Sequence, residues 1–281
     1  MISFIILNYK STKDTIECIE SINKLKGEYN IIVVDNNTLK DDEIKLIKKY
    51  TSDLILLNDN VGFARGNNEG CIYAINKYHP DFLCVINSDI IINQNDFILK
   101  IDELYKKYEF DILGPKILPE ESDSCNPFPV YKTLDEVKNK IAYHKKLINI
   151  YKSRIKRFLL KIYVARNRLK KQVKPKNGMN EVTNVGLHGC ALIFSKKYYK
   201  KYRDIFYPHT FLFHEEEFLY YRSVKDNLLT LYSPQIELIH KEGQSLNKEF
   251  KDDYKKLIFR NQEILKSLEL LKSVMEEDKK I

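Results

Sequence analysis

Cys84-Val85-Ile86-Asn87-Ser88-Asp89-Ile90 is the stretch that decides the fold. The apolar run that starts at Phe82 stops at Ile86, and three short polar residues follow it. An apolar run of this length without alternation is typical of a strand that is buried on both faces. A carboxylate at the carboxyl end of such a strand lies where open α/β sheets bind ligands. Asp89 is therefore a candidate metal ligand, although on this triplet alone a polar strand end that caps the next turn is the better explanation.

The chain before this stretch alternates between buried strands and amphipathic helices. This alternation predicts a Rossmann-like α/β fold with a mainly parallel sheet and right-handed crossovers. A polar cluster follows each strand, so we expect all of these clusters to line one edge of the sheet. The expected strands are 3–7, 31–34, 54–57 and 82–86, and the helices between them are 12–25, 41–50 and 64–78.

The chain after this stretch is less regular. It contains a loop-like segment rich in Pro and Ser, a basic helical segment and a long amphipathic C-terminal helix. We divide the chain into a domain of residues 1–245, with a basic helical insertion at about 131–176, and a C-terminal helical extension of residues 246–281. The further expected helices are 93–108, the second half of 211–224, and 248–277, and the further strands are 111–115, within 182–194, 228–232 and 236–239.

The charge of the 281-residue chain is unevenly distributed. The net charge is +8, but residues 130–176 carry sixteen Lys or Arg and only two acids, which leaves the rest of the chain at −6. Such a distribution indicates a local basic patch rather than a protein that is basic throughout. The apolar residues of this segment recur at helical spacing, which is typical of a helix that lies on an anionic membrane surface. They are Ile148, Tyr151, Ile155, Phe158, Leu159 and Ile162.

Cysteine use and hydropathy indicate where in the cell the protein is expected. The five cysteines include no CxxC pair, which favours reduced thiols in a cytosolic protein. No apolar run approaches the roughly 20 residues of a membrane-spanning helix, and no basic region precedes the first apolar run. We therefore expect a cytoplasmic protein that is peripheral at the inner face of the cell membrane.

Two of the polar clusters suit a nucleotide. Asp35 follows a buried strand and can accept a hydrogen bond from a base or a ribose, although an Asx turn explains it as well. The run Asn60-Val61-Gly62-Phe63-Ala64-Arg65-Gly66-Asn67-Asn68 places glycines, amides and a guanidinium at a helix start, where they suit a phosphate. The run is neither a GxxxxGK[ST] loop nor a GxGxxG loop, which excludes the first class of nucleotide site and weakens the second.

Two further groups supply acid–base chemistry. His214-Glu215-Glu216-Glu217 ends an apolar segment, and one of these glutamates could act as a general base. The alternative is a capped, solvated helix start. His240 follows an apolar strand and could complete a metal shell or contact a diphosphate, but a histidine at a strand end is more often structural.

Taken together, these clusters resemble a family 2 inverting glycosyltransferase of the GT-A fold. The resemblance rests on Ile5 to Lys10, on Val33 to Asn37, on NxGFARGNN at 60–68 and on Asn87-Ser88-Asp89. LHGCALIF at 187–194, FLFHEEEFLYYR at 211–222 and IHKEG at 239–243 are similar to the bacterial polysaccharide branch, which includes capsular and rhamnosyltransferase-like enzymes.

The resemblance implies a role for each matching residue. Asp89 would be the last carboxylate of a DxD-type motif that begins here with Asn87, so binding of Mg²⁺ or Mn²⁺ would rest on Asp89 and His240. Glu216 would be the general base, with Glu215 as the fallback. The residues implied to bind the nucleotide sugar are Asn8, Asp35, Asn37, Asn60, Gly62, Arg65, Asn68 and Ser88.

The implied activity is transfer of a hexosyl or deoxyhexosyl unit from a nucleotide sugar to a growing, lipid-linked bacterial surface glycan, with inversion. The implied partners are the donor, the acceptor and an anionic membrane, and no nucleic acid is expected. Two alternatives stay open: a sugar nucleotidyltransferase, and a non-enzymatic protein that binds membranes or nucleic acid through the basic segment. Release of a nucleoside diphosphate, of pyrophosphate, or of neither separates the three.

Overall fold

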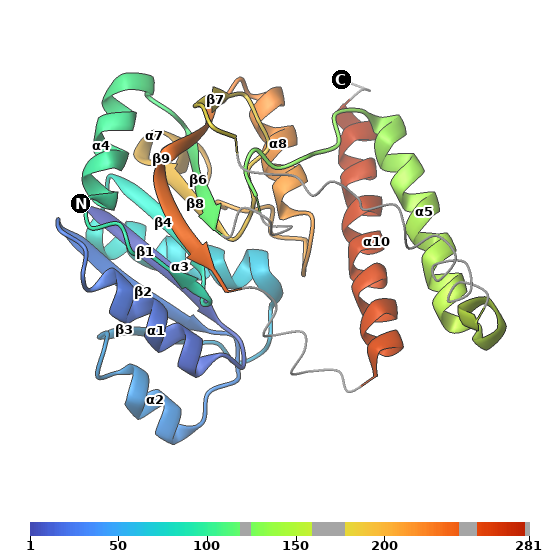
Figure 1. Ribbon diagram of the computed structural model, residues 1–281, viewed down its shortest axis with the longest axis horizontal. Helices are drawn as coiled ribbons and strands as arrows, with labels where there is room; N and C mark the ends of the chain where they lie inside the picture. Colours follow the sequence, from blue (N-terminus) through green and yellow to red (C-terminus); the bar gives the residue numbers. More distant parts are fainter. Residues whose placement is uncertain (119–124, 159–177, 242–251, 279–281) are drawn as a thin grey trace.

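The strands form one mixed sheet at the centre of the molecule (Figure 1). The computed structural model describes residues 1–118, 125–158, 178–241 and 252–278. Within these residues the strand order is β3-β2-β1-β4-β8-β6-β9-β5, and β7 pairs with β9. The strands are β1 (Ile2–Asn8), β2 (Tyr29–Asp35), β3 (Asp53–Leu56), β4 (Phe82–Asn87), β5 (Ile90–Ile91), β6 (Ile112–Leu118), β7 (Val182–Thr183), β8 (Ala191–Ser195) and β9 (Thr230–His240).

The first four long strands pair in parallel, as the alternation of strands and helices predicts. The register sets Asn8 of β1 beside Asp35 of β2, and it sets Leu7 of β1 beside Asn87 of β4. β3 continues the parallel pairing beyond β2. The polar residues that follow these strands therefore meet at one edge of the sheet, which confirms the expected arrangement.

The other half of the sheet is not simply parallel. β8 runs antiparallel between β4 and β6, whereas β9 runs parallel to β6. The two short strands expected at 228–232 and 236–239 are wrong, because β9 is a single strand that crosses Pro234. Its register against β6 jumps from Ser233 to Glu237, and this irregularity accommodates a proline that cannot donate to the ladder.

Helices cover both faces of the sheet. Buried side chains of α1, α2 and α4 pack on one face, and those of α3, α7 and α8 pack on the other. Strand residues alternate between these two clusters, so the sheet has an apolar core on each side. The helices are α1 (Thr12–Ile22), α2 (Asp41–Ile47), α3 (Gly62–Tyr78), α4 (Phe97–Tyr108), α5 (Leu134–Lys152), α7 (Lys196–Lys201), α8 (Glu215–Lys225) and α10 (Asp253–Glu277).

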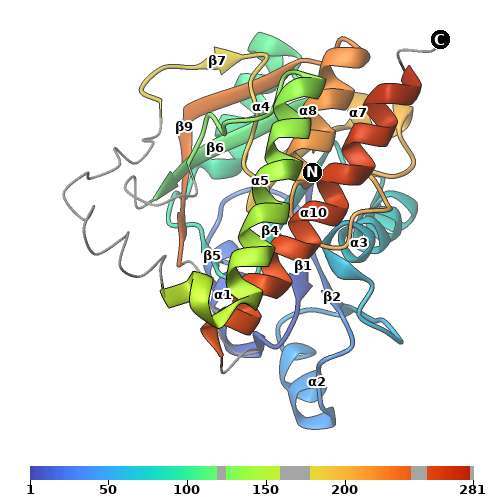
Figure 2. The same ribbon diagram turned by 90° about the vertical axis from the view of Figure 1, so that its right-hand side faces the viewer.

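The helices α5 and α10 form a separate layer beside α8. Figures 1 and 2 show them lying side by side along their length, away from the sheet. Their facing side chains form a third apolar cluster that also takes in Phe218 of α8. The buried members from α5 and α10 are Val137, Ile141, Ile264, Leu268, Leu271 and Met275.

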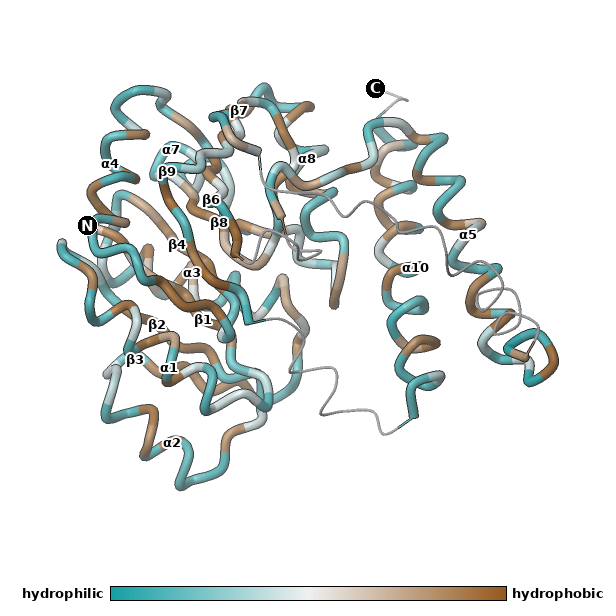
Figure 3. Tube along the Cα trace, viewed as in Figure 1, coloured by the Kyte–Doolittle hydropathy of each residue, from teal (hydrophilic) through white to brown (hydrophobic). Residues whose placement is uncertain are grey.

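The basic helix expected at residues 131–171 is confirmed in its first part. α5 ends at Lys152, and a further helical turn occupies residues 154–158. Leu159 and Ile162, which belong to the expected apolar stripe, lie outside the described residues. The helices carry alternating apolar and polar positions along their length (Figure 3), and none in the described part of the chain is long and apolar enough to cross a bilayer.

The third apolar cluster should be the main source of stability for the α5–α10 layer. Leu268 is fully buried in it, so replacement by alanine should lower the free energy of unfolding by about 2–5 kcal/mol. Leu99 on α4 is 52% exposed and provides the control, because its replacement by alanine should change the free energy by less than about 0.5 kcal/mol. Urea denaturation followed by circular dichroism measures both. Equal effects of the two substitutions would contradict this assignment.

Candidate active site

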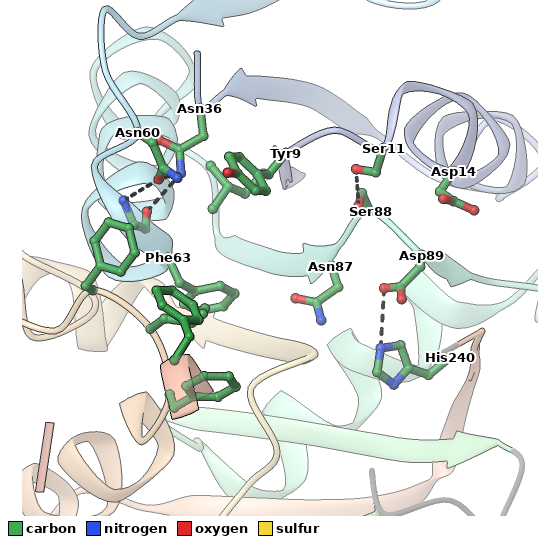
Figure 4. A pocket seen from close by; sticks show the side chains of 16 residues that line it. Tyr9, Ser11, Asp14, Asn36, Asn60, Phe63, Asn87, Ser88, Asp89 and His240 are labelled. Carbon is green, nitrogen blue, oxygen red and sulfur yellow. Dashed lines mark hydrogen bonds and ion pairs between the residues drawn. The ribbon is translucent and has the colours of Figure 1, made fainter. Parts of the chain in front are cut away.

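A cavity of about 420 Å³ opens at the carboxyl ends of β1, β2 and β4. Polar residues line one part of it and aromatic residues line another (Figure 4). Five of the residues that the sequence singles out line this cavity together: Asn60, Gly62, Ser88, Asp89 and His240. The parallel register of β1 to β4 brings the first four together, and the antiparallel pairing of Ile90 on β5 with His240 on β9 adds the fifth.

Asp89 and His240 face each other at one corner of the cavity (Figure 4). His240 Nε2 lies 3.3 Å from Asp89 Oδ1, and their side chains are only 9% and 15% exposed. Burial acts to raise the pKa of the Asp89 carboxyl, but the hydrogen bond and charge of His240 outweigh it and the pKa falls below its ordinary value. The carboxylate is therefore ionised at neutral pH and has an imidazole beside it.

A lysine fixes the chain next to this pair. The Lys241 N–H donates to the Asp89 carbonyl oxygen over 3.1 Å, and its ammonium lies 2.8 Å from the carboxylate of Asp14 and 2.5 Å from that of Glu17. Asp14 also lines the cavity, so its charge there is balanced by Lys241. This arrangement leaves Asp89 as the carboxylate that pairs with His240.

Two amides shape the opposite polar corner. The Asn36 side chain donates to Asn60 Oδ1 over 2.8 Å and accepts from the Val61 N–H over 2.9 Å. Asn60 Oδ1 also accepts from the Gly62 N–H over 3.0 Å. Gly62 has a φ of +84°, and a Cβ there would lie 2.3 Å from the Phe211 carbonyl oxygen. The start of α3 thus requires glycine at this position.

Five other residues that the sequence predicts to bind a nucleotide sugar do not line the cavity. Asn37 and Arg65 are exposed, and the remaining three are buried and hydrogen-bonded within the protein. Asn8 donates to Asp35 over 2.8 Å, and Asp35 also accepts from the Thr38 and Leu39 N–H groups. Asn68 donates to the Phe206 carbonyl oxygen and accepts from its N–H. Any effect of these three side chains on a ligand would pass through the residues that they hold.

An aromatic wall, which we define as Phe63, Phe211, Phe213 and Phe259, lines the other part of the cavity. The Phe63 N–H donates to the Phe211 carbonyl oxygen over 2.7 Å, which docks the loop before α8 onto the start of α3. Phe259 comes from α10 and no pattern in the sequence pointed to it. Asn87, the first position of the DxD-type motif, also lines the cavity. Tyr9, Asn36, Phe211 and Phe213 line it without having been singled out, although each lies within a motif that carried the family resemblance.

The three glutamates at the start of α8 are not among the residues that line this cavity. Glu215 and Glu217 are buried, and Glu216 is partly buried. Burial first, and then the neighbouring charge of Glu216, raise the pKa of Glu215 to about 8. The pKa of Glu216 is also raised above its ordinary value, mainly by burial and secondly by the charge of Glu217. A carboxylate with a raised pKa is suited to take up a proton near neutral pH.

A loop before β8 connects Glu216 with the strand ends. The Gly189 N–H donates to Glu216 Oε1 over 3.0 Å, and the next residue, Cys190, accepts from the Asn87 N–H over 2.9 Å. A Cβ on Gly189 would lie 2.7 Å from the same Glu216 oxygen, so the carboxylate occupies this place only beside glycine. The ring of His188, in the same loop, lies 6.2 Å from that of His240.

The described residues contain no cluster of three or more His, Cys, Asp or Glu side chains arranged around a metal position. Asp89 and His240 nevertheless fit a divalent cation whose remaining ligands come from a phosphate-bearing substrate. Mg²⁺ commonly takes one or two carboxylates and completes its shell with phosphate oxygens and water, and Mn²⁺ also accepts imidazole. The pair can hold such an ion at the cavity corner.

The sequence pattern of the family described as Glycosyl transferase family 2 matches residues 3–203. The matched range contains both polar corners of the cavity except for His240, and it ends before the loop that carries Phe211 and Phe213. No curated protein matches the chain.

Solved structures of S. aureus TarS are similar in fold. Residues 1–349 of TarS in complex with UDP match with a TM-score of 0.53 and 14% identity, over 92% of this chain and 64% of that chain. A second structure of the same TarS residues matches with a TM-score of 0.46 and 16% identity, over 83% of this chain and 60% of that chain. The chain thus spans less than two thirds of the TarS chains that it matches. At these identities the likeness concerns the fold alone, which is the expected GT-A fold.

The raised pKa of Glu215 has a consequence for stability. Its ordinary value is 4.5, so an unfolded chain releases the proton at a lower pH than the folded protein does. Wild-type stability should therefore fall as the pH rises from about 4.5 to about 8. Replacement by glutamine removes the ionisation. The gain in free energy of unfolding of Glu215→Gln over wild type should therefore be larger at pH 8 than at pH 5, by roughly 2–4 kcal/mol.

Denaturation at the two pH values tests this expectation. Glu277→Gln is the matched control, because Glu277 is exposed at the end of α10 and should show no comparable difference. A Glu215→Gln variant whose stability follows that of the wild type at both pH values would contradict a buried, protonated Glu215.

Proposed function

Because the chain belongs to glycosyl transferase family 2, we propose that it transfers a hexosyl or deoxyhexosyl unit from a nucleotide sugar to a growing, lipid-linked bacterial surface glycan, with inversion at the anomeric carbon. One observation carries the proposal: Asn60, Gly62, Ser88 and Asp89, which come from separate motifs of the family, line a single cavity with His240. A capsular or related polysaccharide is the product class that the sequence motifs favour.

The polar side of the cavity suits the donor. Asn36, Asn60 and Gly62 line it near the start of α3 as a set of amides that are hydrogen-bonded to one another, and the corner of Asp89 and His240 suits a diphosphate with its cation. The similar TarS structure is described as a complex with UDP, which supports a nucleoside diphosphate as the ligand class. We propose that the nucleoside lies towards Asn60 and the diphosphate towards Asp89.

The transfer step needs a base on the acceptor side. We propose that the Glu216 carboxylate takes the proton of the acceptor hydroxyl while that oxygen bonds to the anomeric carbon of the donor. The bond between that carbon and the diphosphate oxygen breaks at the same time, so the nucleoside diphosphate leaves with the electron pair. The hydrogen bond from the Gly189 N–H orients the carboxylate, and its raised pKa suits proton uptake. Glu215 is the fallback for this role.

Asp89 and His240 would hold the Mg²⁺ or Mn²⁺ ion, whose chemistry is to neutralise the charge that develops on the leaving diphosphate. An acceptor that is anchored to a lipid places the protein at the inner face of the cell membrane. The same cavity could serve a nucleotidyltransferase, but that enzyme would release pyrophosphate. Release of a nucleoside diphosphate upon addition of acceptor distinguishes the proposed function.

Loss of the Asp89 carboxylate should remove the metal dependence of nucleotide binding. Calorimetric titration of a nucleoside diphosphate into wild-type protein should give tighter binding with Mn²⁺ than without it. Asp89→Ala should give equally weak binding in both cases, because the remaining imidazole cannot replace the carboxylate. Glu28→Ala changes an exposed acid at the opposite edge of the sheet and should behave as wild type. Unchanged metal dependence in Asp89→Ala would remove Asp89 from the metal site.

Replacement of Glu216 by glutamine should separate donor binding from turnover. The amide keeps the shape but cannot take up a proton, so the turnover number should fall by at least about 10²-fold while donor binding stays within about twofold. Donor titration and release of nucleoside diphosphate measure the two quantities. If Glu215→Gln loses turnover and Glu216→Gln does not, the roles of the two residues are reversed. Full turnover in both variants would place the base elsewhere.

A further inference from the structure

The outer side of the α5–α10 layer carries unbalanced positive charge. Between Val137 and Phe158 the chain has eight Lys or Arg and no acid. Two of these cations pair with α10, since Lys138 lies 3.5 Å from Glu276 and Lys145 lies 2.9 Å from Glu269. Four of the other six lie at or just beyond the end of α5, and of these Lys152, Arg154 and Lys156 are exposed.

The expected apolar stripe of the basic segment divides into two parts. Ile148 and Tyr151 are partly buried, and the ring of Tyr151 lies 6.4 Å from that of Tyr254 on α10. The ring contact places Tyr151 against α10, and contact of this part with a membrane stays a prediction. Ile155 and Phe158, in contrast, are 75% and 63% exposed. We call residues 152–158, which lie where the end of α5 meets the start of α10, the hairpin tip, because the two helices pair like a hairpin without being consecutive in the chain.

The hairpin tip combines two features that are unusual on a protein surface. Ile155 and Phe158 are three residues apart in a helical turn, so they lie on the same side of it. Cationic side chains precede and separate them, and Arg157 packs over the Tyr254 ring at 4.4 Å, which attaches the turn to α10. Large apolar side chains among cations are typical of segments that bind at the membrane interface.

The hairpin tip lies close to the cavity along α10. Tyr254, which contacts the tip, is followed after five residues by Phe259, which lines the cavity. Five residues of helix advance by about 7.5 Å. A surface that touches the hairpin tip is therefore near the aromatic wall of the cavity.

We propose that the hairpin tip docks the protein on an anionic lipid bilayer, with Ile155 and Phe158 inserted between headgroups and Lys152, Arg154 and Lys156 on the lipid phosphates. A nucleic acid would match the cations but would leave the exposed isoleucine without an apolar environment. The inference deepens the proposed function, on which it rests, by identifying the surface through which a membrane-bound acceptor is reached. The docking itself requires no turnover.

Vesicle sedimentation of the full chain tests the proposal. Wild-type protein should sediment with vesicles of phosphatidylcholine and phosphatidylglycerol and remain in solution with pure phosphatidylcholine. The double change Ile155→Ser and Phe158→Ser should lower the partition coefficient by about tenfold or more, because both apolar contacts are lost. The double change Lys152→Glu and Lys156→Glu should lower it by at least a similar factor, since each cation contributes roughly fivefold.

The matched control changes two apolar residues of similar exposure elsewhere. Leu99 on α4 and Val224 on α8 are 52% and 61% exposed, and their replacement by serine should leave vesicle binding unchanged. Circular dichroism and calorimetric titration of a nucleoside diphosphate show whether each variant keeps its fold and its nucleotide site. Loss of binding in the tip variants alone, with both other properties intact, is the expected result.

Three results would overturn the proposal. They are equal sedimentation with neutral and anionic vesicles, binding that is insensitive to the tip variants, and tip-dependent binding of an RNA oligonucleotide without binding of vesicles. These results are separate from a failure of the proposed function. Vesicle binding without release of nucleoside diphosphate from any donor would reject the proposed transferase function and keep the membrane surface. Release of nucleoside diphosphate without vesicle binding would reject the membrane surface and keep the transferase function.

Discussion

The parallel pairing of β1 with β2 and β4 is the constraint on which the rest of the structure depends. Hydrogen bonding in this register sets the last residues of three strands side by side, so the polar clusters that follow them meet at one edge. A slip of one residue would turn every strand side chain to the other face and break both apolar clusters. The cavity is thus positioned by the burial of the core, and its own polar residues contribute little to placing it.

The same edge accounts for which parts could be predicted from the sequence. Unalternating apolar runs identified β1, β2 and β4, because a strand that is covered on both faces has no solvent side that would call for polar residues. The run of β3 was identified as well, although this strand lies at the edge of the sheet and its Leu56 is 48% exposed. β9 was divided into two because Pro234 interrupts its pattern, and only pairing with β6 reveals a continuous strand. For the site, residues that follow a strand were found, but the sequence could not distinguish Asp89, which faces the cavity, from Asp35, which is saturated by its own turn.

Long-range contacts account for what the sequence could not supply. Phe259 lines the cavity because α10 packs on α5 and α8, and no local pattern in α10 indicates this. The helical spacing of the basic segment was correctly identified, yet spacing alone does not say what covers the apolar side. The structure gives α10 as the cover for Val137 and Ile141, and it leaves Ile155 and Phe158 exposed. A charge pattern is local, whereas the partner of an apolar face is decided by the whole fold.

The family match ends at residue 203, before His240 of the polar side and before most of the aromatic wall. Apart from Phe63, the aromatic wall comes from residues beyond that limit, and the loop before α8 docks on the start of α3 through the Phe63 N–H and the close approach at Gly62. Because a Cβ at position 62 would meet the Phe211 carbonyl oxygen, a residue other than glycine there would displace the aromatic wall and the start of α3 together, so the two sides of the cavity are mechanically coupled.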